Sequence, residues 1–143
     1  MIPEFNIQQT VPLFDVNEMN VSLQFYEEGL GFKMRNKWIV ENKVKWCWLQ
    51  REGAAIMLQE LNEDHPNRIN ANRTKGKCIS MNFICTDAIE LYKEFRSKNI
   101  HSQIPFVGNN MWVVGLTDPD GFQINFESMT DTPEGTVYDE KAR

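Results

Sequence analysis

The sequence has few of the features that mark secreted, membrane-spanning or metal-bound proteins. It contains only three cysteines, without Cys-x-x-Cys spacing, which argues against a disulfide framework and a zinc knuckle. No apolar run approaches the roughly 20 residues that a membrane-spanning helix needs. The first residues lack the basic and apolar regions of a signal peptide. We therefore expect reduced thiols, a cytoplasmic location and no association with a membrane.

Positive charge is also scarce. The chain has 15 Lys and Arg against 20 Asp and Glu, a formal net charge of −5. This balance does not favour non-specific binding to nucleic acid or to an anionic membrane. The sequence has no glycine-rich nucleotide loop, no Gly-x-Ser-x-Gly elbow and no His-Glu-x-x-His motif, which excludes the enzyme classes that carry them. His65 and His101 fall in a polar segment and just after a helix, so we interpret both as surface imidazoles.

An internal repeat is the main feature that is present. The run 11–16 aligns with 80–85, so that Phe14 falls on Phe83. With the same shift, and later with a shift shorter by one, further apolar pairs coincide: Tyr26 with Phe95, Ile56 with Ile124 and Leu58 with Phe126. The order of elements is the same in both halves, as expected of a duplicated supersecondary unit.

The first unit, residues 8–61, is predicted to have the order βαβββ. A strand over 10–16 leads to a helix capped by Asn17. The buried stripe of this helix is predicted at helical spacing: Met19, Leu23, Tyr26 and Leu30. Gly29 and Gly31 are expected to end it. Three strands follow, at 32–40, 43–49 and 54–60, with a turn at 51–53.

The second unit, residues 77–129, repeats this order after a polar, Asn-rich linker at 62–76. Its helix is capped by Thr86 or Asp87. The helix stripe and the strands are predicted as follows: Ile89, Tyr92 and Phe95, and strands at 77–85, 102–107, 111–117 and 122–128. Residues 130–143 form a polar tail that is disordered or drapes over the other half. We expect residues 1–143 to form a single domain.

Two motifs, one in each half, give the chain a family resemblance. Ser22-Leu-Gln-Phe-Tyr26 is followed by Gly29-Leu-Gly-Phe32, and Asp118-Pro-Asp-Gly121 is followed by the run to Glu127. They are similar to the signatures of the vicinal-oxygen-chelate superfamily, which includes glyoxalases, bleomycin-resistance proteins and extradiol dioxygenases. The resemblance covers roughly residues 8–129. It implies an α+β fold, in which two βαβββ modules form a curled mixed sheet around a cavity, and a homodimer.

The resemblance also implies four positions for the ligands of a divalent metal ion, which are usually His, Gln or Glu. Carried over one by one, these positions fall on Val11, Met57, Ser80 and Asn125. A hydrocarbon, a thioether, a hydroxyl and an amide are weak donors. A slip of one residue would bring Gln59 or Glu60 near the second position. We therefore expect no metal ion and no cofactor.

A cavity without metal can still bind a small molecule, because such pockets are mostly apolar with a few placed polar groups. The candidate walls come from the first and last strands of each module and from three tryptophans: Val11, Leu13, Met57, Gln59, Ser80, Asn82, Asn125, Glu127, Trp46, Trp48 and Trp112. The tryptophans alternatively fill the core between sheet and helix. Glu127 is the only carboxylate that we consider for acid–base chemistry, and no acid–base pair stands out.

Three functions follow from these observations. In the first, the protein resembles the metal-free bleomycin-resistance branch and sequesters a cationic aromatic drug or metabolite without catalysis, as in antibiotic resistance; an acidic chain with aromatic surfaces suits such a ligand. In the second, it is a divalent-metal-dependent glyoxalase- or dioxygenase-type enzyme with a displaced or degenerate site, using Gln59, Glu60, Glu127 or a histidine. In the third, a structural or regulatory protein fills the cavity with its own side chains.

Overall fold

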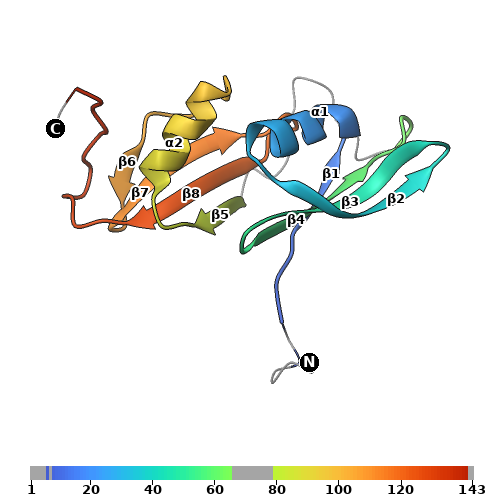
Figure 1. The fold of residues 1–143 in the computed structure, drawn as a ribbon, viewed down its shortest axis with the longest axis horizontal. Coiled ribbons are helices and arrows are strands. Elements are labelled where there is room, and N and C mark those ends of the chain that lie inside the picture. Colours follow the sequence, from blue (N-terminus) through green and yellow to red (C-terminus); the bar gives the residue numbers. More distant parts are fainter. Residues whose placement is uncertain (1–5, 7, 66–78, 142–143) are drawn as a thin grey trace.

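The chain forms two open, four-stranded mixed sheets, each with helical structure packed on one face (Figure 1). The computed structural model describes residues 6, 8–65 and 79–141. The strand orders are β1-β4-β3-β2 and β5-β8-β7-β6, which is the same arrangement twice. β1 and β5 pair in parallel with β4 and β8, and the other neighbours are antiparallel. The predicted α+β fold of two βαβββ units is confirmed; its strands are divided between two sheets, and neither closes into a barrel.

The first sheet and its helix lie between residues 13 and 60. The elements are β1 (Leu13–Val16), α1 (Met19–Leu23), the π-helix η1 (Gln24–Gly29), β2 (Lys33–Val40), β3 (Lys43–Arg51) and β4 (Ala54–Glu60). Burial alternates along β1, where Phe14 and Val16 face the helix and Leu13 faces away. This alternation is the two-residue period of a strand with one covered face.

The second sheet repeats the design. Its elements are β5 (Ser80–Ile84), α2 (Ala88–Ser97), β6 (Phe106–Gly108), β7 (Met111–Thr117) and β8 (Gln123–Met129). The strands predicted at 54–60 and 111–117 have the bounds of β4 and β7. β6 begins later than the predicted 102, and β1 and β5 are shorter than predicted; residues 77 and 78 of the latter prediction lie outside the described residues. In the part of the chain that the structure describes, no helix is long and apolar enough to cross a membrane.

The prediction that Asn17 caps the first helix is wrong. Glu18 is the N-cap residue and makes no capping bond with its side chain, while the N–H of Asn17 donates to Oδ1 of Asp120 at 3.1 Å. In the second helix, Asp87 is the cap of the two predicted alternatives, because its Oδ1 accepts from the N–H of Glu90 at 3.0 Å. A cap supplied locally can be predicted from sequence, whereas a carboxylate about a hundred residues away cannot.

The start of α1 is instead held by the buried carboxylate of Glu60, at the end of β4. Oε2 of Glu60 accepts from the N–H of Met19 at 2.7 Å, and Oε1 lies 2.8 and 2.9 Å from the Nζ atoms of Lys43 and Lys45. Burial acts to raise the pKa of Glu60, but these three donors outweigh it and lower the pKa to about 2. The carboxylate therefore ties sheet and helix together in its ionised form.

The two glycines expected to end the first helix have different roles. Gly31 has the left-handed conformation, with φ 79°. Gly29 belongs to η1, and a Cβ there would lie 2.6 Å from Cδ1 of Ile100, which follows α2. Gly29 thus permits the first helical segment to approach the second module closely.

The repeat aligns residues that are equivalent in the structure. Phe14 lies beside Leu58 across the β1–β4 pair, and Phe83 lies beside Phe126 across the β5–β8 pair. Tyr26 and Phe95 are both fully buried on the helical segments that cover these strands. The same apolar positions therefore form the sheet–helix layer in both modules.

A buried turn joins the two modules. Oδ2 of Asp118 accepts from the hydroxyl of Tyr26 at 2.8 Å, and its Oδ1 accepts from the N–H groups of Asp120 and Phe122 at 2.9 and 2.8 Å. Burial raises the pKa of Asp118 to about 6, and the Asp120 carboxylate adds to the rise against the opposing hydrogen bonds. The ring of Phe122 stacks on that of Phe14 with 4.2 Å between centroids. The Asp-Pro-Asp-Gly motif thus acts across the module boundary as well as in its own turn.

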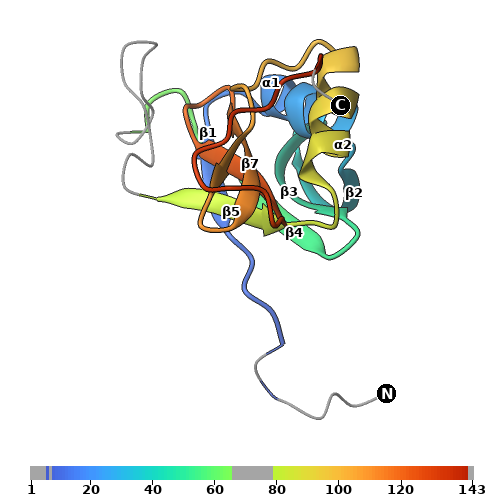
Figure 2. The same cartoon turned by 90° about the vertical axis from the view of Figure 1, so that its left-hand side faces the viewer.

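The C-terminal segment, residues 130–141, packs on the second module rather than on the first (Figure 2). The N–H of Val107 donates to the carbonyl of Thr136 at 2.8 Å, beside the outer strand β6. The ring of Tyr138 lies edge-on to Trp112 with 6.1 Å between centroids. Part of the exposed edge of the second sheet is therefore covered by the chain itself.

We expect Tyr26→Ala and Phe95→Ala each to lower the free energy of unfolding by about 3–5 kcal/mol, because each removes a fully buried ring from equivalent layers. Tyr26→Phe should cost about 1–2 kcal/mol, since it removes only the hydrogen bond to buried Asp118. Urea denaturation measures all three. A loss below about 1 kcal/mol for both alanine variants would contradict the repeat register.

The second prediction concerns acid stability. The pKa of Glu60 lies below its ordinary value of 4.5, so its contribution is present at neutral pH and is lost as the pH falls from about 4.5 towards 2. Glu60→Gln should lower the free energy of unfolding by roughly 2–4 kcal/mol at pH 7, and by less at pH 3. Urea denaturation at both pH values checks this, with the exposed Glu28→Gln as the control. An equal loss of unfolding free energy at both pH values would contradict this prediction.

Candidate functional site

Each sheet has one face that no helix of the described chain covers, and we call these the open faces. The helical segments α1, η1 and α2 lie along the same side of the molecule (Figures 1 and 2). The open faces consequently look towards the other side. Because side chains alternate along a strand, the register of the sheets decides which predicted residues reach these faces.

One cross-strand row on the first open face is apolar. Leu13, Met57 and Trp48 are successive Cα partners across β1, β4 and β3. The indole N–H of Trp48 donates to Oε1 of Gln50 at 3.2 Å, which fixes the orientation of the ring. Leu13 is 48% exposed, and Trp48 is half-buried. The row is therefore an accessible apolar surface with one oriented aromatic ring.

The next row adds two more tryptophans. Trp46 on β3 has Gln59 of β4 as its Cα partner on one side and Trp38 of β2 on the other. The side chain of Trp38 is 60% exposed. Trp38 was not predicted as a wall residue. A register shift between Trp38 and Ile39 brings it opposite Trp46, whereas unbroken counting from the hairpin turn places Lys37 there. Trp38, Trp46 and Trp48, which we call the tryptophan group, share this open face.

The second open face carries a row of side-chain amides. Nδ2 of Asn125 donates to Oδ1 of Asn82 at 2.8 Å, and Nε2 of Gln123 donates to Oδ1 of Asn125 at 3.0 Å. Oγ of Ser80 lies 3.4 Å from Oδ1 of Asn82. We call Gln123, Asn125 and Asn82 the amide row. Asn82 was predicted as a ligand wall and Gln123 was not, although it stands two residues before Asn125 on the same strand.

Beyond the amide row this face becomes apolar around one carboxylate. Glu127 has Ile84 and Val113 as its Cα partners on the two neighbouring strands. Ile84 is 68% exposed and Met129, at the end of β8, is 75% exposed. Polar recognition groups and uncovered apolar surface therefore lie on one face.

Trp112 does not join the other predicted wall residues. It pairs with Ser128, whose Oγ accepts from the N–H of Ala88 at the start of α2, so this pair lies on the helix-covered face. The ring of Trp112 contacts Tyr138 of the C-terminal segment. Trp112 therefore packs on the helix side of its sheet, as the alternative interpretation of the tryptophans expected. Trp46 and Trp48 do not, because they lie on the open face.

The implied metal positions are divided between the two sheets, at Val11, Met57, Ser80 and Asn125. Val11 precedes β1, so the cross-strand neighbour of Met57 is Leu13 and not Val11. In the second sheet, the neighbour of Asn125 is Asn82 and not Ser80. These donors do not fit a divalent metal ion. Among the described residues no three His, Cys, Asp or Glu side chains are grouped so that they could hold one.

Glu60, the carboxylate that a slip of one residue would have brought near the metal position, faces the helix. Both of its oxygens are engaged, by Met19 and by two lysines. Gln59 does face the open side, next to Trp46. A register shifted in this way therefore places the amide of Gln59, and no carboxylate, on the open face.

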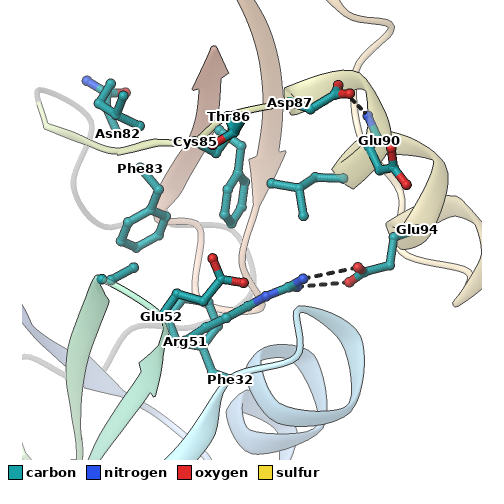
Figure 3. A pocket seen from close by; sticks show the side chains of 15 residues that line it. Phe32, Arg51, Glu52, Asn82, Phe83, Cys85, Thr86, Asp87, Glu90 and Glu94 are labelled. Carbon is teal, nitrogen blue, oxygen red and sulfur yellow. Dashed lines mark hydrogen bonds and ion pairs between the residues drawn. The ribbon is translucent and has the colours of Figure 1, made fainter.

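A groove of about 770 Å³ opens between the modules (Figure 3). Three phenylalanine rings line it: Phe32, Phe83 and Phe126. At the groove, Arg51 of the first module donates to both oxygens of Glu94 on α2, at 2.9 and 3.1 Å. These bonds raise the pKa of Arg51 and lower the pKa of Glu94. Asn82 is the predicted wall residue that lines this groove, so it reaches both the groove and the open face.

The cysteines offer no activated nucleophile in the described residues. Burial raises the pKa of Cys47 to about 11, and burial also raises the pKa of the half-buried Cys85. A thiol with a raised pKa stays protonated at neutral pH and is a poor nucleophile. Cys78 lies outside the described residues.

Comparison with solved structures shows where this fold occurs. A bleomycin-binding protein solved in complex with bleomycin superposes with a TM-score of 0.66 at 20% identity, covering 85% of this chain and 98% of that one. A glyoxylase/bleomycin resistance protein/dioxygenase domain from Frankia sp. EAN1pec gives 0.65 at 12% identity, with 91% and 96% covered. Virulence protein STM3117 from Salmonella typhimurium gives 0.58 at 20% identity, with 88% and 100% covered. At such identities the likeness establishes the fold alone.

The sequence itself gives a family match. No curated protein matches the chain significantly. The family model described as Glyoxalase/Bleomycin resistance protein/Dioxygenase superfamily, however, matches residues 9–126, from before β1 of the first unit into β8, the last strand of the second. The chain belongs to the glyoxalase/bleomycin resistance protein/dioxygenase superfamily.

Proposed function

We propose that this protein binds a small organic molecule on its open faces without a metal ion. In this proposal it sequesters a cationic aromatic drug or metabolite in the cytoplasm, which would protect a cell from an antibiotic of that kind. The observation that carries the proposal is the tryptophan group on the first open face, combined with weak donors at the four positions where the family resemblance implies metal ligands, among which Asn125 is the one amide.

The tryptophan group suits a flat ligand. Indole rings offer large apolar surfaces for stacking, and their negative π faces attract cations. The hydrogen bond from Trp48 to Gln50 holds one ring in place before a ligand arrives, which reduces the entropy lost on binding. The net charge of −5 adds a weak attraction for a cation.

The bleomycin-binding protein supplies the first compound to test. It shares the fold and was solved with bleomycin bound. At 20% identity it does not identify the ligand of this chain, so bleomycin serves as a probe of the proposed class. An enzyme with a displaced metal site would need several strong donors together, but Glu60 is already engaged and Glu127 has the apolar Ile84 and Val113 as its cross-strand neighbours.

We also propose that the protein is a homodimer. Large apolar side chains are uncovered on the open faces and near them, among them Leu13, Trp38, Ile84 and Met129. A second copy would cover part of these faces and enclose a ligand between chains. Open sheet faces and edges in a chain this small leave much apolar surface in water, which favours association.

Light scattering should return a mass near twice the 16.7 kDa of one chain at micromolar concentration. Ile84→Asp should shift the protein towards the monomer, because it places a charge on an exposed apolar position of the open face. Val21→Asp is the matched control, since Val21 is also exposed but lies on the helical side. A monomer mass for the wild type across this range would reject the dimer.

Bleomycin should raise the melting temperature of the chelator-treated protein, whereas Zn²⁺, Ni²⁺ or Fe²⁺ alone should not. A ligand that binds only the folded state stabilises it by roughly 2.7 kcal/mol at a hundredfold excess over its dissociation constant. Trp46→Leu and Trp48→Leu should each weaken binding about 3- to 30-fold, through lost stacking and cation–π contact.

Trp112→Leu is the matched control for these variants, because Trp112 lies on the helix-covered face. Its bleomycin affinity should stay within about threefold of the wild type. A large thermal shift with a metal ion, removed by chelation, would replace the binding proposal with the enzyme alternative. If neither metal nor bleomycin shifts the transition, drug sequestration loses its support.

A further inference from the structure

The two modules meet at two junctions, which the internal repeat makes equivalent. In the first junction, the turn before β8 faces the end of β1 and the start of α1, and Asp120 accepts from the N–H of Asn17. In the second junction, the turn before β4 faces the end of β5 and the start of α2, and the groove lies between them (Figure 3). The two junctions can therefore be compared position by position.

A contact at the start of each helix confirms this equivalence. The N–H of Met19 donates to the carboxylate of Glu60 at 2.7 Å, and the N–H of Ala88 donates to Oγ of Ser128 at 2.9 Å. Both contacts join the first turn of a helix to the last strand of its own sheet. The repeat aligns these two pairs of residues, so the alignment of the sequence halves is also the alignment of the structures.

One aromatic ring of the first junction is missing from the second. The repeat aligns Phe83 with Phe14 and Ala54 with Phe122. In the first junction the ring of Phe122 stacks on that of Phe14, with 4.2 Å between centroids and 9° between planes, and Phe14 is 6% exposed. In the second junction a methyl group takes the place of that ring, and Phe83 is only half-buried. The groove therefore contains the space of one ring.

Both side chains that border this space face the groove. Ala54 shares the helix-covered face of β4 with fully buried Leu58, because side chains alternate along the strand. The ring of Phe83 meets those of Phe32 and Phe126 at a tilt, with 5.8 and 5.2 Å between centroids. Among the described residues no ring stacks flat on Phe83. A flat ligand could take the position that the ring of a phenylalanine has in the first junction.

The rim of the groove favours a cation. Its charged lining residues are four carboxylates and one guanidinium: Glu52, Asp87, Glu90, Glu94 and Arg51. Arg51 and Glu94 neutralise each other through two hydrogen bonds. In the described chain no Lys or Arg forms an ion pair with the other three carboxylates. The positive end of the α2 dipole, about half a charge, offsets only part of their negative charge.

We propose that this groove binds a small aromatic ammonium compound, whose ring stacks on Phe83 and whose cation lies at the acidic rim. The volume of about 770 Å³ lies within the roughly 300–1,000 Å³ of small-molecule pockets, which are also mostly apolar with a few polar groups. The groove borders the helix-covered side of the sheets and contains none of the tryptophan group. This second site therefore goes beyond the proposed function and does not depend on it.

Three compounds test the site: 2-phenylethylammonium, the uncharged 2-phenylethanol, and ethylammonium, which lacks the ring. Binding to the full chain is followed by ¹⁵N NMR, through the backbone N–H signals of Gly53 and Leu91 in the groove and the indole signals of the tryptophan group. 2-Phenylethylammonium should shift the two groove signals with an affinity in roughly the millimolar range. It should bind about fivefold more tightly than 2-phenylethanol at low salt, and ethylammonium should give no saturable shift.

Ala54→Phe supplies the missing ring from the chain itself. This variant should raise the melting temperature by about 2–5 °C, through stacking on Phe83, and should weaken the binding of 2-phenylethylammonium at least tenfold. Val21→Phe is the matched control, because it adds the same ring at an exposed position of α1 outside the groove, and it should keep the wild-type affinity. Phe83→Leu keeps an apolar side chain but removes the stacking surface, so it should weaken binding about tenfold.

A charge-neutralising pair of substitutions tests the rim. Glu52→Gln combined with Glu90→Gln should bring the affinities for the ammonium compound and the alcohol to within about twofold of each other. Glu28→Gln combined with Glu41→Gln is the matched control, since it removes the same charge from exposed positions outside the groove. The control should keep the fivefold preference.

The outcomes separate this site from the proposed function. Shifts of the indole signals without shifts of Gly53 and Leu91 overturn the groove site and leave binding on the open faces standing. Undiminished binding to Ala54→Phe, or to Phe83→Leu if Ala54→Phe does not fold, also overturns the site. Equal affinities of the wild type for the ammonium compound and the alcohol overturn the proposed ligand class. Groove shifts in a protein that does not bind bleomycin support the site and count against the proposed function alone.

Discussion

The two modules meet at one buried turn, where the hydroxyl of Tyr26 donates to the carboxylate of Asp118. The same carboxylate closes its own turn by accepting from two backbone N–H groups. A buried carboxylate without such donors would be costly, so each module needs the other for Asp118 to be satisfied. Stacking of Phe14 on Phe122 and the contact of Gly29 with Ile100 then become possible around this fixed point.

The open faces are a consequence of that arrangement. The helical segments are held on one side of both sheets, so the other faces are left uncovered by helix (Figure 1). The side chains on one face are mainly aromatic, and those on the other are amides and a carboxylate. Because function resides in the site and not in the fold, the weak metal donors on these faces, and not the family fold, underlie the proposal of binding without a metal ion.

Local patterns predicted the fold well, and distant contacts limited the rest. The repeat gave the βαβββ order and the equivalent rings Tyr26 and Phe95, because apolar periodicity follows from burial within one unit. The cap of α1 could not be predicted, since Glu60 reaches it from 41 residues away. In the site, Trp48 and Met57 were both predicted as wall residues, but Trp38 was missed because the extra residue Lys45 in β3 changes the register between β2 and β3. Trp112 was predicted as a wall residue, but it shares the helix-covered face of β7 with buried Val114 and Leu116.

The most direct test of metal-free binding on the open faces is ¹⁵N NMR of the indole N–H signals. The four tryptophans give four such signals, and three belong to the tryptophan group. With chelator present, titration with bleomycin should shift the signals of Trp38, Trp46 and Trp48 while that of Trp112 stays in place. A shift confined to Trp112, or shifts that appear only after a metal ion is added, would contradict the account.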